Sequence, residues 1–184
     1  YIKNDYSQGL AQDFKTEYEK LGGKVVAMET GVQNDKDFKT QLTKIKGTNP
    51  DALYIPNYVA EIAQILEQAK QLGLTCKIYS ADGFSNPEIF KLAGKLTEGV
   101  IFSNSAEDKT NEASKKAFTA KYLARFGDEP DAFSLNSYDA ANILIMAIEK
   151  NYHELSDADK KDLKLDREKI RGYVAATRDF PGVS

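Results

Sequence analysis

Residues 51–82 read "DALYIPNYVAEIAQILEQAKQLGLTCKIYSAD", and this stretch carries the clearest signal of the fold. It opens on a short apolar run, "DALYIPN" (51–57), and closes on a second one, "KIYSAD" (77–82), each typical of a buried strand. Between them, apolar residues recur at helical spacing: Ile62, Ile65, Leu66, Ala69 and Leu72. One helix is the length that a parallel crossover needs. The stretch therefore predicts a strand–helix–strand unit with parallel strands.

The same alternation runs through the first hundred residues. Strands are expected at 1–4, 24–30, 51–57, 77–82 and 99–105, and helices at 7–23, 35–50 and 59–74. After residue 106 the pattern becomes helical, with apolar stripes over 112–127, 131–151 and 167–180. Alternation of this kind predicts an α/β fold with a doubly wound, mostly parallel five-stranded sheet of order 2-1-3-4-5 and helices on both faces. A length of 184 residues suits a single domain.

Composition excludes two classes of partner. Hydrophobic residues make up 41% of the chain and charged residues 29%, as in a globular protein. The 25 Lys and Arg residues are interspersed with 28 Asp and Glu residues, and the net charge of −3 leaves no basic face for nucleic acid. No apolar run approaches the roughly 18 residues of a transmembrane helix.

The motifs of catalysis are missing. The chain contains neither the phosphate loop GxxxxGK[ST] nor the dinucleotide fingerprint GxGxxG. His153 is the only histidine and lies in a polar segment, which argues against a zinc site or a histidine-based triad. "DADKKD" (157–162) lacks the glycine and final glutamate of a calcium loop and is interpreted as a solvated, helix-capping run. Cys76 is interpreted as a buried, inert thiol. We expect no enzyme activity, no cofactor and no metal; a small flavodoxin-like enzyme is an alternative that the missing phosphate loop weakens.

Function is expected where the strands end. Open α/β sheets bind ligands outside the carboxyl ends of their strands. That rule selects the segments 4–9, 56–61, 81–86 and 103–108, and within them the candidate ligand contacts Tyr6, Tyr58, Asp82, Phe84 and Asn104. Aromatic faces beside one carboxylate suit an organic cation or the ammonium end of an amino acid. The alternatives are structural: an aromatic residue after a strand is often a lid on the core, and Asp82 before a glycine is ordinary turn chemistry.

The order of several strings resembles a known family. They are "NDYSQGLAQDFKTEYEKLGGKVV" (4–26), "DFKTQLTKIKGTNPDALYIPNYVAEIAQILEQAKQLGL" (37–74), "YSADGF" (79–84), "LTEGVIFSN" (96–104), "FGDEPDAFSLNSYDAANILIMAIEK" (126–150) and "DREKIRGYVAATRDFPGVS" (166–184). Together they resemble the type I periplasmic binding proteins, in the branched-chain amino acid (Leu/Ile/Val) branch of ABC-transporter substrate-binding proteins. The resemblance covers most of the chain.

The resemblance implies a two-lobed architecture with the ligand between the lobes. Residues 1–184 then correspond to the second, C-terminal lobe, entered inside its first strand, and the N-terminal lobe with its signal or lipoprotein sequence is missing. The implied function is an extracytoplasmic solute-binding component of an ABC importer, periplasmic or lipid-anchored, with an amino acid as ligand and ABC permease subunits as partners. A ligand-sensing receptor domain of the same fold, binding an amide or other small molecule, is the alternative.

The resemblance also assigns roles to three residues. Tyr6 matches a position whose ring and backbone line the ligand, and Tyr58 matches an aromatic wall beside it. Asp82 matches the acidic position that takes the ligand's α-ammonium group, where close relatives often carry Glu. Phe84 and Asn104 are candidates from their strand-end positions only.

Overall fold

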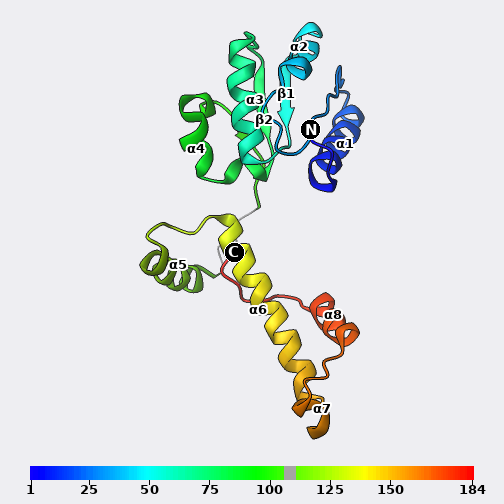
Figure 1. Ribbon diagram of the computed structural model, residues 1–184, viewed down its shortest axis with the longest axis vertical. Helices are drawn as coiled ribbons and strands as arrows, with labels where there is room; N and C mark the ends of the chain where they lie inside the picture. Colours follow the sequence, from blue (N-terminus) through cyan, green and yellow to red (C-terminus); the bar gives the residue numbers. More distant parts are fainter. Residues whose placement is uncertain (106–110) are drawn as a thin grey trace. The chain divides into compact units, whose positions relative to one another are not determined.

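The computed structural model describes residues 1–105 and 111–184. The described residues form two compact units, one over Tyr1–Ser105 and the other over the residues that follow (Figure 1). The candidate residues Tyr6, Tyr58, Asp82, Phe84 and Asn104 all belong to the first unit. Residues 106–108 of the last candidate segment lie outside the described residues.

The first unit is built on a small parallel sheet. Its strands are β1 (Ala52–Ile55), β2 (Lys77–Ser80) and β3 (Ile101–Phe102), in the order β1-β2-β3. The helix α3 (Val59–Gln71) connects β1 to β2, and a chain of short helices connects β2 to β3: η1 (Asp82–Ser85), α4 (Glu88–Ala93) and η2 (Gly94–Thr97). The predicted strand–helix–strand unit is therefore confirmed, as are the parallel direction and the adjacency of the last three predicted strands.

The first two predicted strands are represented only by a single backbone bridge. Ile2 and Gly31 form an isolated parallel bridge, in which the Gly31 amide donates to the Tyr1 carbonyl at 2.9 Å. Beyond that bridge, residues 24–30 form no ladder with another strand among the described residues. The five-strand order 2-1-3-4-5 is thus not confirmed, because the sheet observed has three strands. A strand needs a partner backbone, and the edge of β1 away from β2 faces a groove instead of a neighbour.

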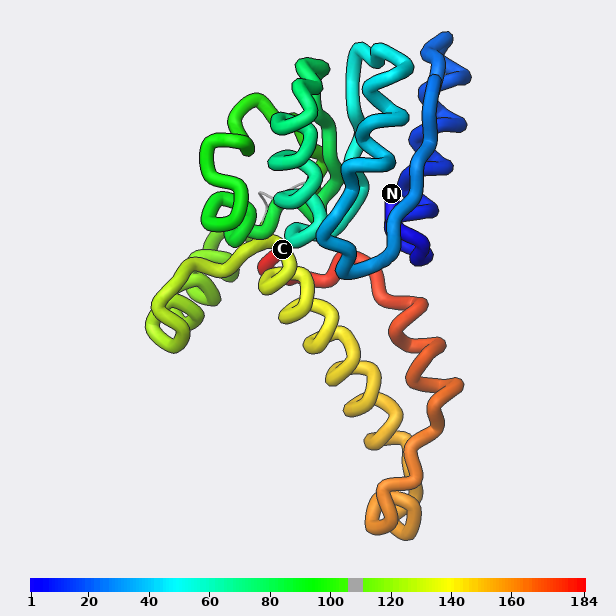
Figure 2. The backbone as a smooth tube through the Cα atoms, turned by 45° about the horizontal axis from the view of Figure 1, so that its top comes forward, coloured from blue at the N-terminus to red at the C-terminus, as the bar shows by residue number. Residues whose placement is uncertain are grey.

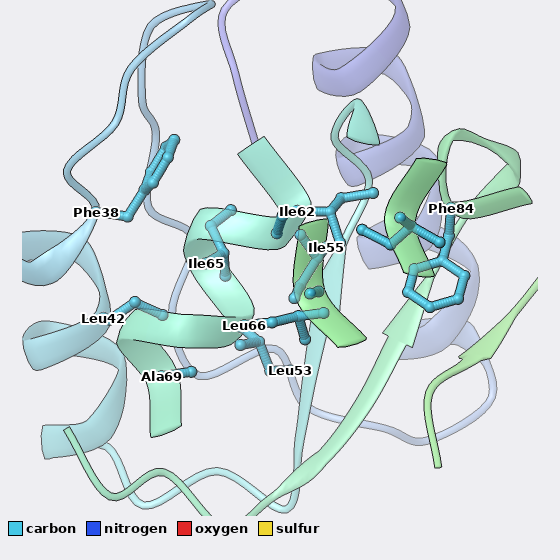
Figure 3. Packing of buried hydrophobic residues seen from close by; sticks show 12 residues of the cluster. Phe38, Leu42, Leu53, Ile55, Ile62, Ile65, Leu66, Ala69 and Phe84 are labelled. Atoms are coloured by element: carbon cyan, nitrogen blue, oxygen red, sulfur yellow. The ribbon is translucent and has the colours of Figure 1, made fainter. Parts of the chain in front are cut away.

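Helices cover both faces of this sheet. On one face Leu53 and Ile55 of β1 pack against α3 and against α2 (Lys39–Gly47), in a cluster that also contains Phe84 (Figure 3). Side chains alternate along a strand, so Tyr54 points to the other face. There it stacks on Phe14 of α1 (Asp5–Lys20), with ring centroids 4.4 Å apart. The doubly wound character that the sequence predicts is present in this unit.

Two buried polar side chains of α3 hold the loop that precedes α2. Glu61, only 2% exposed, accepts a hydrogen bond from the amide of Asn34 at 2.8 Å. Gln68 accepts one from the amide of Phe38 at 2.7 Å and donates one to the carbonyl of Lys36 at 2.8 Å. These bonds satisfy backbone groups that have no helix or strand of their own.

The second unit is helical. It contains α5 (Glu112–Phe126), α6 (Ala132–His153), α7 (Asp157–Lys161) and α8 (Arg167–Ala176). The short helix α7 lies in the stretch predicted as a helix-capping run, and Ser156 caps it. α8 packs along α6 (Figure 2). Lys150 of α6 lies over the ring of Tyr173 of α8, with its Nζ 4.2 Å from the ring centroid.

One carboxylate on α6 fastens the last residues of the second unit. Asp139, which is buried, accepts hydrogen bonds from the amides of Val183 and Ser184 at 2.8–2.9 Å and from the Ser184 hydroxyl at 2.6 Å. Among the residues that the structure describes, none of the helices is long and apolar enough to cross a membrane.

Candidate ligand-binding site

Tyr6 is positioned by a tightly capped helix start. The side chain of Asn4 accepts the amide hydrogen bond of Ser7 at 2.9 Å, the usual way to begin a helix. The Ser7 hydroxyl in turn accepts from the amide of Ile2 at 2.9 Å, inside the bridge to Gly31. The first turn of α1 is therefore fixed to the sheet side of the unit, and Tyr6 leaves it in a defined direction.

The phenol of Tyr6 meets Asp82 although 76 residues separate them. Its hydroxyl donates to Asp82 Oδ1 at 2.6 Å and accepts from the amide of Gly83 at 3.1 Å. Asp82 lies two residues after the end of β2 and is the first residue of η1, so both residues lie beyond the carboxyl end of the sheet. The predicted convergence of these two segments is observed.

Burial and the neighbouring carboxylate keep the Tyr6 phenol protonated. Desolvation is the larger cause, and the hydrogen bond to Asp82 adds to it, so the pKa of Tyr6 is raised well above the ordinary value of a phenol. Tyr54 also has a raised pKa, because of burial and then the charge of Asp82. The phenol of Tyr6 consequently remains a donor that orients Asp82 at neutral pH.

The aromatic ring of Tyr58 forms one side of the cluster. It lies at the N-cap position of α3, three residues after the end of β1, and is 37% exposed. Its ring stacks on that of Tyr6, with centroids 5.0 Å apart and planes 17° apart. The pair presents aromatic surface next to a carboxylate, which is the combination that attracts an organic cation.

Gly83 allows the backbone after β2 to lie close to Asn57 and Tyr6. A Cβ atom there would collide with the carbonyl oxygen of Asn57 and would lie 3.2 Å from the Tyr6 hydroxyl. From the sequence, Asp82 was a candidate ligand contact and Gly83 was interpreted only as part of a possible Asp-Gly turn, so the close approach of Gly83 to Asn57 was not predicted. A glycine directly after the candidate acid was the available signal.

The two remaining candidates lie apart from this cluster. Phe84 is 3% exposed and packs in the core, with its ring 4.9 Å from that of Phe102. Asn104 is exposed, and its side chain accepts the amide hydrogen bond of Ser105 at 3.0 Å. Ligand contacts from Phe84 and Asn104 stay predictions.

The arrangement is suited to binding rather than to covalent chemistry. Its one charged group is a carboxylate, and the groups around it are aromatic rings and backbone amides. Cys76 lies elsewhere, and burial raises the pKa of its thiol, which keeps it in the unreactive protonated form. A positively charged ligand group would find an oriented acceptor at Asp82 and ring faces beside it.

A family comparison agrees with this reading. The family model described as "Periplasmic binding protein" matches residues 1–180. The chain belongs to the periplasmic binding protein family. The resemblance stated from the sequence is thereby confirmed.

Several relatives of this chain are named as amino acid-binding proteins. The leucine-, isoleucine-, valine-, threonine- and alanine-binding protein of Pseudomonas aeruginosa is 32% identical over 151 residues, which are 80% of this chain and 39% of that protein. Leu/Ile/Val-binding protein homolog 3 of Brucella melitensis is 30% identical over 148 residues, again 80% of this chain and 40% of its own length. The chain therefore spans about two fifths of the length of these relatives.

Solved structures of periplasmic binding proteins show the type I fold. A leucine-binding protein, LivK of Thermotoga maritima, superposes with a TM-score of 0.82 at 36% identity, covering 98% of this chain and 49% of that one. The substrate-binding protein LivJ of Streptococcus pneumoniae, solved in complex with isoleucine, gives a TM-score of 0.74 at 31% identity, covering 98% and 48%. These relatives are named as binding proteins, not as enzymes.

Proposed function

We propose that this chain is part of the extracytoplasmic substrate-binding component of an ABC importer for a branched-chain or related amino acid. The observation that carries the proposal is the hydrogen bond from Tyr6 to Asp82 beside the stacked rings of Tyr6 and Tyr58. It sets an oriented carboxylate and ring faces at the edge of the sheet where open α/β folds bind ligands. ABC permease subunits are the proposed partners.

In this proposal Asp82 receives the α-ammonium group of the ligand. A carboxylate and an ammonium group form a charge-assisted hydrogen bond, which is among the stronger polar contacts. Tyr6 holds one carboxylate oxygen, so the acid is oriented before the ligand arrives. Tyr58, being partly exposed, is free to contact the ligand from the side.

We further propose that residues 1–184 form one lobe of a two-lobed protein, with the five-stranded order 2-1-3-4-5 in its sheet. The support is that the LivK match covers 98% of this chain but 49% of that one. A single lobe offers half of the ligand contacts, and closure of a second lobe supplies the rest. Because a ligand shifts a hinge equilibrium only through differential affinity, the 184-residue chain alone should bind amino acids little or not at all.

Calorimetric titration tests both parts of the proposal. L-leucine, L-isoleucine and L-valine should bind the two-lobed protein and should give no measurable heat with residues 1–184 at micromolar concentrations. Micromolar binding by residues 1–184 would contradict the single-lobe proposal. Binding of an uncharged amide in preference to every amino acid would favour a sensor domain instead.

A pair of variants tests the role of Asp82 in the two-lobed protein. Asp82→Asn should weaken amino acid binding by about 10- to 100-fold, the worth of a hydrogen bond to a charged group, and should affect uncharged amides far less. Asp51→Asn is the matched control, because Asp51 is exposed and precedes β1 at the opposite end of the strand. Equal losses for amino acids and amides would show that Asp82 does not receive an ammonium group.

A further inference from the structure

The dipeptide Asp82–Gly83 has a covalent reactivity of its own. When glycine follows aspartate, the next amide nitrogen can close a five-membered ring on the side-chain carboxyl carbon, because glycine has no Cβ atom to shield that nitrogen. The sequence contains no other Asp-Gly pair and no Asn-Gly pair. The most reactive dipeptide of this kind therefore lies within the candidate ligand site.

The packing of the turn requires this reactive pair. Gly83 is buried, and a Cβ atom at this position would collide with the carbonyl oxygen of Asn57. A larger residue after Asp82, which would slow ring closure by crowding the nitrogen, is therefore excluded. Protection of the pair has to come from contacts made by other residues.

The hydroxyl group of Tyr6 contacts both reacting groups of the pair. It donates to Oδ1 of Asp82 at 2.6 Å and accepts from the amide of Gly83 at 3.1 Å. Ring closure requires the carboxyl group to turn onto the amide nitrogen, and it requires that N–H group to give up its proton. Both hydrogen bonds to Tyr6 must break before this can happen.

The other hydrogen bonds of this turn involve different atoms. The Ser85 hydroxyl donates to the main-chain carbonyl of Asp82 at 2.7 Å, and the Phe84 amide donates to the carbonyl of Ala81 at 2.9 Å. They fix the shape of η1 but contact neither the carboxyl group of Asp82 nor the amide of Gly83. Among the residues that the structure describes, both of these groups bond to Tyr6.

From these contacts we infer that Asp82–Gly83 is a site of isoaspartate formation and that the Tyr6 hydroxyl suppresses this modification in the folded chain. The Gly83 nitrogen bonds to Cγ of the protonated Asp82 carboxyl group, whose hydroxyl leaves as water together with the amide proton. Water then opens the succinimide ring. Cleavage of the bond from nitrogen to the main-chain carbonyl carbon of Asp82 gives isoaspartate, and cleavage of the bond to Cγ restores aspartate. One water molecule is released and one is consumed, so no further reactant is needed.

Isoaspartate at position 82 removes the ligand acid, a consequence that rests on the proposed function. The main chain then runs through Cβ and Cγ, and the free carboxylate is attached to Cα. It no longer lies where Asp82 Oδ1 accepts the bond from Tyr6. Tyr6 thus preserves the acid chemically in addition to orienting it.

The test ages the 184-residue chain at 37 °C in mildly acidic buffer and measures isoaspartate at position 82. Mass spectrometry with electron-transfer fragmentation of the tryptic peptide 78–91 gives this fraction. Tyr6→Phe should raise the rate of formation about 10-fold or more, the factor that loss of a hydrogen bond to a charged group permits. Asp82→Glu in the Tyr6→Phe chain should abolish the signal, because the ring would then need six members.

Two controls separate the hydroxyl contact from general loosening of the fold. Leu42→Ala weakens the core of the same unit but leaves Tyr6, Asp82 and Gly83 unchanged, so it should raise the rate much less than Tyr6→Phe. In concentrated urea, where Tyr6 holds neither group, the wild-type and Tyr6→Phe chains should react equally fast. The unfolded wild-type chain should also react about 10-fold or more faster than the folded one, for the same reason.

Three results would overturn the inference. The first is equal rates in the folded wild-type and Tyr6→Phe chains. The second is equal acceleration by Tyr6→Phe and Leu42→Ala, because global unfolding would then be the route. The third, which needs no variant, is equal rates in the folded and the unfolded wild-type chain. None of these measurements uses a ligand, so their failure is distinct from a failure of the proposed amino acid binding.

Discussion

Replacing Tyr6 by phenylalanine removes one hydroxyl group and leaves the ring in place. The stack on Tyr58 is kept, but Asp82 loses a donor at 2.6 Å and the amide of Gly83 loses an acceptor at 3.1 Å. A hydrogen bond to a charged group contributes about 1.5–3 kcal/mol, and partial exposure of Asp82 favours the lower end. An orphaned amide on the buried Gly83 adds about 1 kcal/mol. Tyr6→Phe should therefore lower the free energy of unfolding by about 2.5 kcal/mol.

Urea denaturation at pH 7 measures this loss, and a double-mutant cycle with Asp82→Asn isolates the pair. The cycle should give a coupling energy of about 1–2 kcal/mol. Tyr54→Phe is the matched control, because Tyr54 is a half-buried tyrosine of the same unit whose hydroxyl makes no hydrogen bond with the described residues. The reasoning fails if Tyr6→Phe costs no more than Tyr54→Phe, or if the coupling energy is near zero.

Three further predictions concern stability. Gly83→Ala should lower the free energy of unfolding, measured by urea denaturation, by about 1–3 kcal/mol, because the added methyl group collides with the Asn57 carbonyl. The control Gly9→Ala has open space around it in α1 and should raise the free energy of unfolding by about 0.5–1 kcal/mol. Equal effects of the two substitutions would refute the packing argument. Asp139→Ala should release the Val183 amide and speed its hydrogen exchange by at least 10-fold, and unchanged exchange would show that the carboxylate does not hold it. Because the folded-state pKa of Tyr6 is raised, its contribution is complete below about pH 10, the pKa of an unfolded tyrosine, and is lost as the pH rises beyond it. The wild-type chain should thus lose stability above pH 10 more steeply than Tyr6→Phe in denaturant titrations, and parallel pH profiles would contradict this.

Periodicity predicted the local elements of the fold well. The apolar spacing from Ile62 to Leu72 and the flanking runs gave α3, β1 and β2 within a few residues, because helix and strand periods are properties of the local chain. α7 escaped notice because it is short and carries no apolar stripe. Residues 24–30 have the composition of a strand, yet strand formation depends on a partner backbone that local sequence does not describe.

The site was predictable only in outline. The rule about strand ends brought Tyr6, Tyr58 and Asp82 to one edge of the sheet, and the structure joins them there. The direct bond from Tyr6 to Asp82 was not foreseen, because side-chain geometry across 76 residues is set by packing. Neither was the collision that makes Gly83 necessary, because it involves the backbone of a separate segment.

The hydrogen bonds between α3 and the loop before α2 affect which positions of this protein tolerate amino acid substitution. Glu61 and Gln68 contact the amides of Asn34 and Phe38 and the carbonyl of Lys36, all of which are main-chain groups. Any amino acid except proline at positions 34 and 38 supplies the same amides, and every amino acid at position 36 supplies the carbonyl. Related sequences can therefore vary at position 36, whereas position 34 has a φ of 69° that favours Asn, Asp or Gly and position 38 carries the core ring of Phe38. Glu61 and Gln68 stay under constraint, so a mutational scan should find tolerance at position 36 and sensitivity at Glu61 and Gln68 of α3.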